Sequence, residues 1–195
     1  MDYILDLFLK HIISEKCIKE EEADVYRFGL ECMILKLIHY VSYIIIALAL
    51  HSLPSLLISS CVMISLRSKA GGYHAKTRIG CYAFSCSMIT VLCLLNRMVL
   101  PELIHMVMLV IANIIILVWA PVENENRPLE QVEINVFRKQ VIITLLIADA
   151  IIFVMIWQNI SICNFLINGI VMISILLTLE KTKGWKCFCS DLDKA

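Results

Sequence analysis

Residues 67–86 read RSKAGGYHAKTRIGCYAFSC, and this segment holds the residue types that nucleophilic catalysis needs. His74 follows a pair of glycines, and Cys81 comes seven residues later, at the start of an apolar run. A free thiol has a pKa of about 8.5, but a neighbouring imidazole and a helix N-terminus both favour the thiolate, which is the nucleophile. The segment therefore predicts a catalytic pair with Cys81 as nucleophile.

The spacing of His74 and Cys81 favours a bent chain. In one continuous helix their Cα atoms would lie about 10 Å apart along the axis, which is too far for contact. Gly71 and Gly72 break helical continuity, so a loop can fold back and bring the imidazole to the sulfur. A surface histidine beside an inert buried thiol is the alternative, and spacing alone does not decide between the two.

The same segment carries four basic side chains that either attract an acidic substrate or only mark membrane topology. They are Arg67, Lys69, Lys76 and Arg78. The backbone N–H of Cys81, at the expected helix start, is a candidate donor for an oxyanion hole. His74, Cys81 and Cys86 lack the paired close spacing of a structural zinc site, so we expect no metal and no cofactor.

The composition is that of a membrane protein. Hydrophobic residues make up 60% of the 195 residues and charged residues 17%, against about 25% charged in soluble domains. The net charge is zero, which removes any argument for a nucleic-acid partner. Nine cysteines, an odd number placed mostly in apolar runs, do not predict disulfides.

Six apolar stretches are long enough, or nearly so, to cross a bilayer as helices. They are residues 30–50, 52–66, 81–97, 101–120, 140–157 and 160–179. Lysine and arginine concentrate in the N-terminal segment, the second and fourth connections and the tail. With six spans all four basic segments fall on one side, so the positive-inside rule places them in the cytoplasm. Dropping 52–66, the shortest stretch, would split them across the membrane.

We therefore expect an all-α, polytopic membrane helix bundle with six transmembrane helices. Residues 1–28 form an N-terminal segment whose apolar spacing suits an amphipathic helix on the membrane surface. Residues 29–180 form the six-span membrane domain, with cytoplasmic loops 67–80 and 120–139, and residues 181–195 form a cytoplasmic tail.

Charged residues inside the apolar stretches support a second hypothesis. Such charges usually mark a pathway, a proton relay or a structural pair. Lys36 and Asp149 suit an interhelical ion pair, whereas a small peptide transporter would use Lys36, Glu102 and Asp149. Three asparagines are expected to bond between helices. They are Asn113, Asn164 and Asn168.

Two motifs in this chain resemble the accessory gene regulator B (AgrB) family. The first is Arg67 with the run AGGYHA and Cys81, and the second is APVENENRPL at residues 120–129. The length, the span pattern and the position of both motifs agree, so the resemblance covers nearly the whole chain.

The resemblance implies a bacterial cell-membrane cysteine endopeptidase that processes quorum-sensing peptide precursors. His74 would be the general base, Cys81 the nucleophile, and Arg67 and Gly72 functionally important positions. The substrate would be an AgrD-type propeptide with an amphipathic leader, a signal sequence and an acidic tail. Cys81 would release the tail, and a Cys or Ser of the peptide would capture the thioester as a thiolactone or lactone ring.

The motifs assign no third catalytic residue. Ser85 lies four residues after Cys81 on the same helix face, and Glu123, Glu125 and Asn126 lie in the other loop and can approach. A simple dyad also stays open. Membrane lipid is an expected partner, nucleic acid is not, and a homodimer is one open option for the oligomeric state.

Overall fold

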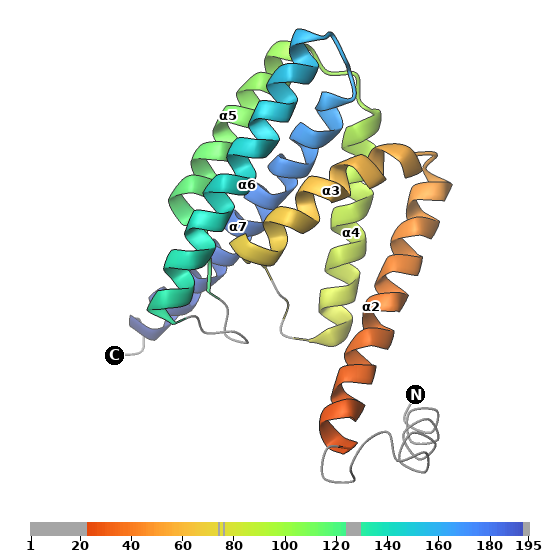
Figure 1. Cartoon of the computed structure of the whole chain (residues 1–195). Helices are drawn as coiled ribbons and strands as arrows, with labels where there is room; N and C mark the ends of the chain where they lie inside the picture. The colour runs from red at the N-terminus through yellow and green to blue at the C-terminus, as the bar shows by residue number, and fades with distance from the viewer. Residues whose placement is uncertain (1–22, 74, 76, 124–129, 193–195) are drawn as a thin grey trace. The chain divides into compact units, whose positions relative to one another are not determined.

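The computed structural model describes residues 23–73, 75, 77–123 and 130–192, with side chains through residue 182 (Figure 1). All regular secondary structure in these residues is α-helical, which confirms the predicted fold class. The helices are α2 (Ala23–Ala49), α3 (Leu53–Ala70), α4 (Arg78–Arg97), α5 (Glu102–Trp119), α6 (Gln131–Trp157) and α7 (Cys163–Leu192). The expected amphipathic helix near the N-terminus lies outside the described residues.

The chain forms two compact units, Met1–Ile45 and Ile46–Ala195. The described part of the first unit is most of α2, an apolar helix long enough to cross a membrane. Within it His39 Nδ1 lies 3.1 Å from the Tyr43 hydroxyl, one turn further along. This hydrogen bond gives the polar His39 ring a partner on its own helix.

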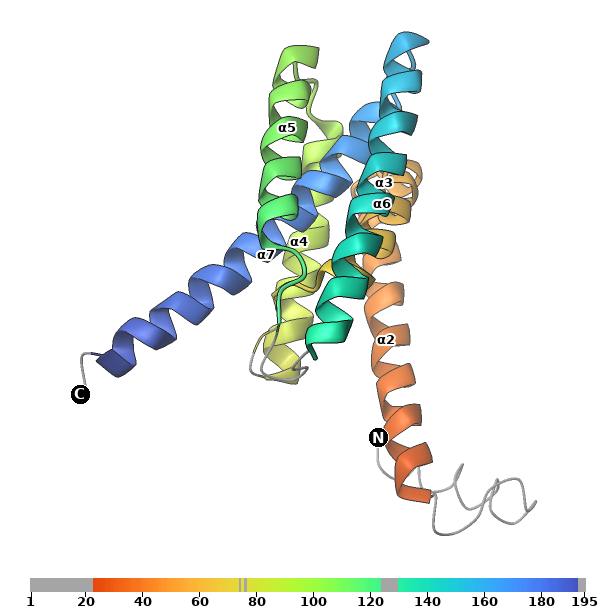
Figure 2. The same ribbon diagram turned by 60° about the vertical axis from the view of Figure 1, so that its left-hand side comes forward.

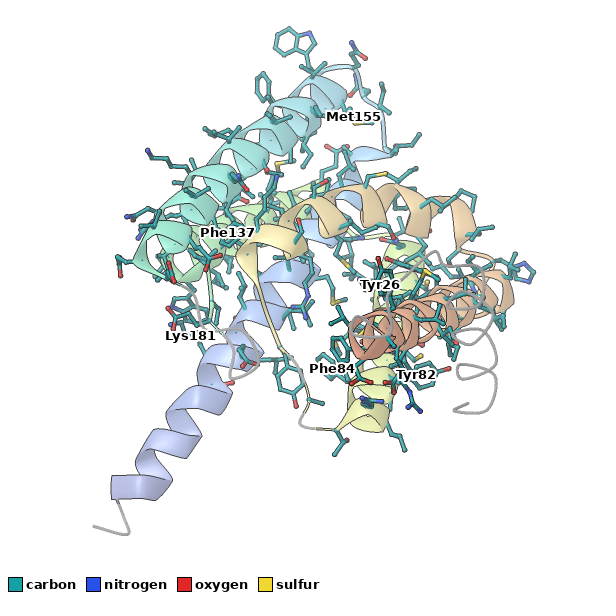
Figure 3. The ribbon with its side chains drawn as sticks, turned by 60° about the horizontal axis from the view of Figure 1, so that its bottom comes forward. Tyr26, Tyr82, Phe84, Phe137, Met155 and Lys181 are labelled. Atoms are coloured by element: carbon teal, nitrogen blue, oxygen red, sulfur yellow. The ribbon has the colours of Figure 1, made fainter. Side chains whose placement is uncertain are left out.

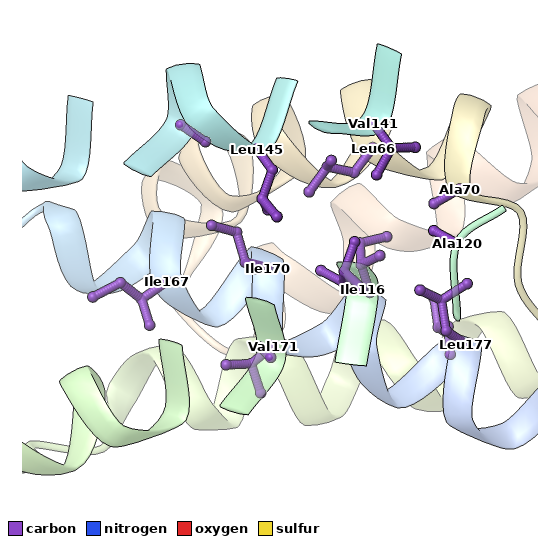
Figure 4. Packing of buried hydrophobic residues seen from close by; sticks show 14 of the residues in the cluster. Leu66, Ala70, Ile116, Ala120, Val141, Leu145, Ile167, Ile170, Val171 and Leu177 are labelled. Carbon is purple, nitrogen blue, oxygen red and sulfur yellow. The ribbon is translucent and has the colours of Figure 1, made fainter. Parts of the chain in front are cut away.

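The second unit is built around α7. Of the residues in its candidate span, 72% are buried, against at most 22% in any other span. Helices α3, α4, α5 and α6 all contact it (Figures 1 and 2). Leu66, Ile116, Val141 and Ile170 bring α3, α5, α6 and α7 together in one core (Figure 4). Because α7 is apolar on every side along this stretch, burial at the centre of a bundle is the stable arrangement for it.

Five of the described helices are long and apolar enough to cross a membrane, and α3 is the one that is not. The protein is thus a multi-pass membrane protein, and α3 as a sixth span stays a prediction. Serines lower the apolarity of α3. Ser59 Oγ donates to the Phe165 carbonyl of α7 at 2.8 Å, whereas Ser65 Oγ donates to the Cys61 carbonyl of α3 itself. A helix shielded by neighbours in this way does not need a fully apolar surface.

Contacts at both ends of α3 show how it runs beside α4. At its start, Ser52 Oγ lies 3.5 Å from the Cys93 carbonyl, and Arg97 donates to the Leu50 carbonyl at 3.1 Å. Just beyond its other end, the Tyr73 ring packs on Phe84. Helix α3 therefore starts beside the C-terminal half of α4, and the chain that follows α3 reaches the N-terminal half of α4.

Residues 71–73 and 120–123 lie together at one end of this unit, which we call the loop end (Figure 1). The Val122 amide donates to the Ala70 carbonyl at 2.9 Å, and the Tyr73 amide donates to the Leu176 carbonyl at 3.2 Å. These bonds bring the second motif, the first motif and α7 to one place. The two basic connections therefore share one end, as the span count requires.

The helices extend into segments that we expected to be loops. The loop expected at 67–80 is 71–77, because α3 continues to Ala70 and Thr77 caps α4. The loop expected at 120–139 ends at Glu130, where a capping box starts α6. The expected tail, 181–195, continues α7 as far as Leu192.

The crossing of α3 and α7 predicts the effect of one methyl group. A Cβ on Gly169 would lie 2.7 Å from the Ser59 carbonyl oxygen, which is part of the backbone and cannot swing away. We expect Gly169→Ala to lower the free energy of unfolding by about 1–3 kcal/mol. The measurement is the Tm of the full chain purified in detergent. Gly29→Ala is the control, since a Cβ there meets nothing within 4 Å. Equal Tm values would contradict this close crossing.

Candidate active site

Arg67 holds the turn that follows α3. Its Nη1 donates to the Gly71 carbonyl at 3.1 Å, and its Nη2 donates to the Tyr73 carbonyl at 2.8 Å. Hydrogen bonds from a charged donor are stronger than neutral ones, and the two guanidinium arms fix direction as well as distance. Arg67 therefore sets the path along which the chain reaches position 74.

The two glycines of the first motif are needed because their surroundings leave no room for a side chain. Gly71 has φ +75° and Gly72 has φ +134°, a region that other residues rarely adopt. A Cβ on Gly72 would overlap Nη1 of Arg67, and one on Gly71 would overlap the Val122 carbonyl oxygen. The functional importance that the resemblance assigns to Arg67 and Gly72 thus has a structural explanation.

The second motif packs against the first. Besides the hydrogen bond from its amide to Ala70, Val122 is buried, and its backbone lies directly against Gly71. The preceding Ala120–Pro121 peptide bond is cis. Two segments that are about 50 residues apart in the sequence therefore form one structure at the loop end.

Tyr73 connects this structure to α4 and α7. Its amide bonds to the Leu176 carbonyl of α7, and its ring centroid lies 4.5 Å from that of Phe84 on α4. Figure 3 views the bundle toward the loop end, with Phe84 labelled on α4 and Lys181 on α7. Phe84 follows Cys81 by three residues, so the residue before His74 contacts the helix that carries the candidate nucleophile.

Cys81 is the fourth residue of α4 and its thiol is half-buried. The Thr77 hydroxyl accepts from the Gly80 amide at 3.1 Å, and the Thr77 carbonyl accepts from the Cys81 amide at 2.9 Å. The prediction that the Cys81 N–H serves an oxyanion hole is therefore wrong, because that group makes the first-turn helical bond.

The remaining predicted residues are only partly described. His74 lies outside the described residues, but the break between Ala70 and Arg78 excludes one continuous helix through positions 74 and 81. Ser85 is half-buried, one turn after Cys81, and Glu123 is exposed. Glu125 and Asn126 also lie outside the described residues.

Comparison with known proteins shows the family of this chain. The model of the family accessory gene regulator B matches residues 5–179. The chain belongs to this family. A Clostridium beijerinckii protein described as AgrB-like is 26% identical over 120 residues, so the match spans 60% of this chain and 60% of the relative. No solved structure matches the chain.

Within this AgrB-family chain, two of the four basic residues of the first motif make internal contacts. Arg67 binds the backbone of its own turn, and Lys69 Nζ donates to the Thr144 hydroxyl of α6 at 2.9 Å. Arg78 is exposed, and Lys76 lies outside the described residues. Arg67 and Lys69 therefore hold parts of the fold together, and Arg78 is the exposed one among the three described residues.

Two asparagines inside the bundle bond to side chains of neighbouring helices. Asn113 of α5 donates to Asp149 of α6 at 2.9 Å, and Asn168 of α7 donates to Asn96 of α4 at 2.9 Å. Both asparagines bond between helices, as expected. Asn164 instead accepts from the adjacent Cys163 thiol at 3.6 Å and lines a cavity of about 360 Å³ at the opposite end of the bundle.

These pairings bear on the transporter hypothesis. Asp149 makes an interhelical hydrogen bond, which is a structural role for a carboxyl group in a span. Glu102 is exposed and lines the same cavity as Asn164. Lys36 belongs to the other unit, and its pairing with Asp149 stays a prediction.

The sequence offered no sign of one buried residue at the loop end. Glu180 is 8% exposed and lies on α7, one turn after Leu176. It stands where the last apolar run ends, and a charge in that place is typical of a solvated flank. Its burial depends on how α7 packs, which no local pattern encodes.

The contact between Gly72 and Arg67 predicts a second substitution effect. In Gly72→Ala the new methyl group must displace the guanidinium, and the positive φ adds strain of about 1–3 kcal/mol. We expect a lower Tm and a loss of whatever activity the loop supports. Ser68→Ala is the control, because Ser68 is exposed and lies next to Arg67 on α3; this variant should keep the wild-type Tm. A wild-type Tm for Gly72→Ala would show that Arg67 does not occupy this place.

Proposed function

We propose that the protein is a membrane cysteine endopeptidase that removes the C-terminal tail of an AgrD-type quorum-sensing precursor and promotes its cyclisation. One observation carries the proposal: the two motifs pack together, and Tyr73 of the first motif contacts Phe84 of α4, three residues after the half-buried Cys81. Membership of the accessory gene regulator B family supports a role in processing the signal peptide. In this proposal the loop end faces the cytoplasm, because it carries the basic connections.

The anchoring of Tyr73 supports a meeting of His74 and Cys81. Covalent geometry places the Cα of His74 about 3.8 Å from that of Tyr73. Tyr73 is held through its amide, its carbonyl and its ring, and the ring contact is with Phe84, less than one turn from Cys81. The residue before His74 is therefore fixed beside the helix that carries the thiol.

The reaction begins when His74 takes the proton of the Cys81 thiol. The sulfur attacks the carbonyl carbon of the peptide bond that follows the signal sequence, and a tetrahedral intermediate forms. His74 then returns the proton to the departing nitrogen, the C–N bond breaks, and the acidic tail leaves with a free amine. The signal sequence remains attached to Cys81 as a thioester.

In the cyclisation step the same carbonyl carbon is attacked a second time. A thiol or hydroxyl inside the peptide attacks the thioester carbonyl, forms the ring and releases the Cys81 thiol. Exchange between two thioesters roughly conserves bond energy, so water must be restrained if the ring is to form before hydrolysis. The half-buried position of Cys81 suits that requirement.

The test is cleavage of the cognate precursor, co-expressed with the full chain and followed by mass spectrometry of the peptide. A short neighbouring reading frame that encodes a leader, an internal Cys or Ser and an acidic tail identifies this precursor. We expect Cys81→Ala to abolish cleavage while the protein still inserts into the membrane. Cys86→Ala is the matched control, since Cys86 is also half-buried on α4. Full processing by Cys81→Ala would refute the proposal.

A further inference from the structure

A cavity of about 360 Å³ lies at the end of the bundle opposite the loop end, where α5 begins, α6 ends and α7 begins (Figure 2). Its size falls within the range of about 300–1,000 Å³ that is usual for ligand sites. Much of its wall is apolar, but four polar side chains also line it: Glu102, Asn159, Ser161 and Asn164. An apolar wall with a few polar groups is typical of a site that binds a small molecule.

The polar side chains of this cavity have unused hydrogen-bonding capacity. Among the residues that the structure describes, Glu102, Asn159 and Ser161 have no side-chain hydrogen bond and no ion pair. Asn164 accepts from the Cys163 thiol through its side-chain oxygen, which leaves its amide nitrogen to donate. The cavity therefore presents one carboxylate and a set of neutral donors to a molecule that enters it.

Exposed side chains indicate the depth of the cavity in a bilayer. Trp157, the last residue of α6, is 80% exposed at the same end of the bundle, and tryptophan concentrates at the boundary between bilayer and water. Leu103 lines the cavity and begins an exposed apolar stripe on α5 that continues with Val107 and Val110. These positions follow the helical repeat, so the stripe runs from the cavity along the helix. A polar cavity that adjoins such a stripe suits a molecule with a polar head and an acyl chain.

We propose that this cavity binds the headgroup of a phosphatidylethanolamine molecule. The Glu102 carboxylate accepts hydrogen bonds from the ammonium group of the lipid, and the phosphate accepts from Asn159, Ser161 and Asn164. One acyl chain lies along the stripe on α5 that begins at Leu103. This lipid site lies apart from the loop end, and its existence does not depend on the proposed endopeptidase function.

The charge of the cavity distinguishes between classes of lipid. Glu102 is the one charged side chain among the described residues that line it, so the cavity attracts a cationic group and repels the net negative charge of phosphatidylglycerol. Phosphatidylcholine carries a trimethylammonium group, which has no N–H to donate to a carboxylate. Phosphatidylethanolamine is zwitterionic, and its ammonium group has three N–H donors. It therefore suits both the carboxylate and the neutral donors.

The experiment measures lipid binding to the full chain, purified in detergent, by native mass spectrometry. Phosphatidylethanolamine, phosphatidylcholine and phosphatidylglycerol are offered one at a time, and we expect the wild type to bind the first most tightly. Glu102→Gln removes the charge but keeps the size of the side chain, so its affinity for phosphatidylethanolamine should fall roughly fivefold, as for the loss of one exposed ion pair. Asp24→Asn is the control, because Asp24 is exposed at the start of α2, and it should bind as the wild type does.

Asn159→Gly is a second variant, and it tests the contact with the phosphate. Asn159 has φ +55°, which glycine adopts without strain, so this change removes the carboxamide and leaves the backbone in place. We expect weaker binding of phosphatidylethanolamine and an unchanged Tm without added lipid. Because a ligand that binds the folded state raises Tm, this lipid should raise the Tm of the wild type more than that of either variant. If Glu102→Gln does not accumulate, Asn159→Gly tests the proposal alone.

Three results would overturn the proposal. The first is equal affinity of the wild type and either variant for phosphatidylethanolamine, and the second is tighter binding of phosphatidylglycerol by the wild type. Free O-phosphoethanolamine carries the same phosphate and ammonium groups without acyl chains, so we expect it not to compete with the lipid at equal concentration. Full competition is the third result, since it would overturn the assignment to a lipid. None of these assays measures precursor cleavage, so their failure and that of the proposed function are distinguishable.

Discussion

The hydrogen bonds from Arg67 to the carbonyls of Gly71 and Tyr73 set the course of the chain after α3. The guanidinium occupies the space that a side chain at Gly72 would need, so the arginine and the glycine require each other. With the turn fixed, the Ala70 carbonyl accepts from Val122, and Tyr73 reaches α7 and α4. The structure at the loop end thus depends on the side chain of Arg67 and on the lack of a side chain at Gly72.

The turn after α3 is fixed against α7, the most buried helix of the bundle. The helix is buried along most of its span, and its backbone accepts bonds from two segments: Phe165 from Ser59, and Leu176 from Tyr73. Apolar packing holds α7 in the bundle, while these polar bonds fix its register against α3 and the loop. Interhelical polar bonds of this kind specify position more than they add stability. Precise placement is what a catalytic pair requires, since an error of about 1 Å can slow a reaction greatly.

Much of the fold follows from local patterns in the sequence. Apolar runs predict the helices, and Val122 in the second long connection bonds to Ala70 at the start of the first. That both connections face the cytoplasm stays a prediction from the basic segments. The placement of Cys81 in the first turn of a helix was also predictable, because a polar loop and Gly80 precede an apolar run. Long-range contacts were not. The burial of Glu180, for example, depends on residues distant in the chain.

The central claim is that Cys81 carries the signal peptide as a thioester. The most direct measurement is to mix the purified full chain with its cognate precursor, quench in acid within one turnover, and find the adduct by mass spectrometry. The account predicts an added mass equal to the precursor without its tail, located on the Cys81 peptide and released by hydroxylamine. Cleavage with no adduct on Cys81, or an adduct on another cysteine, would contradict it.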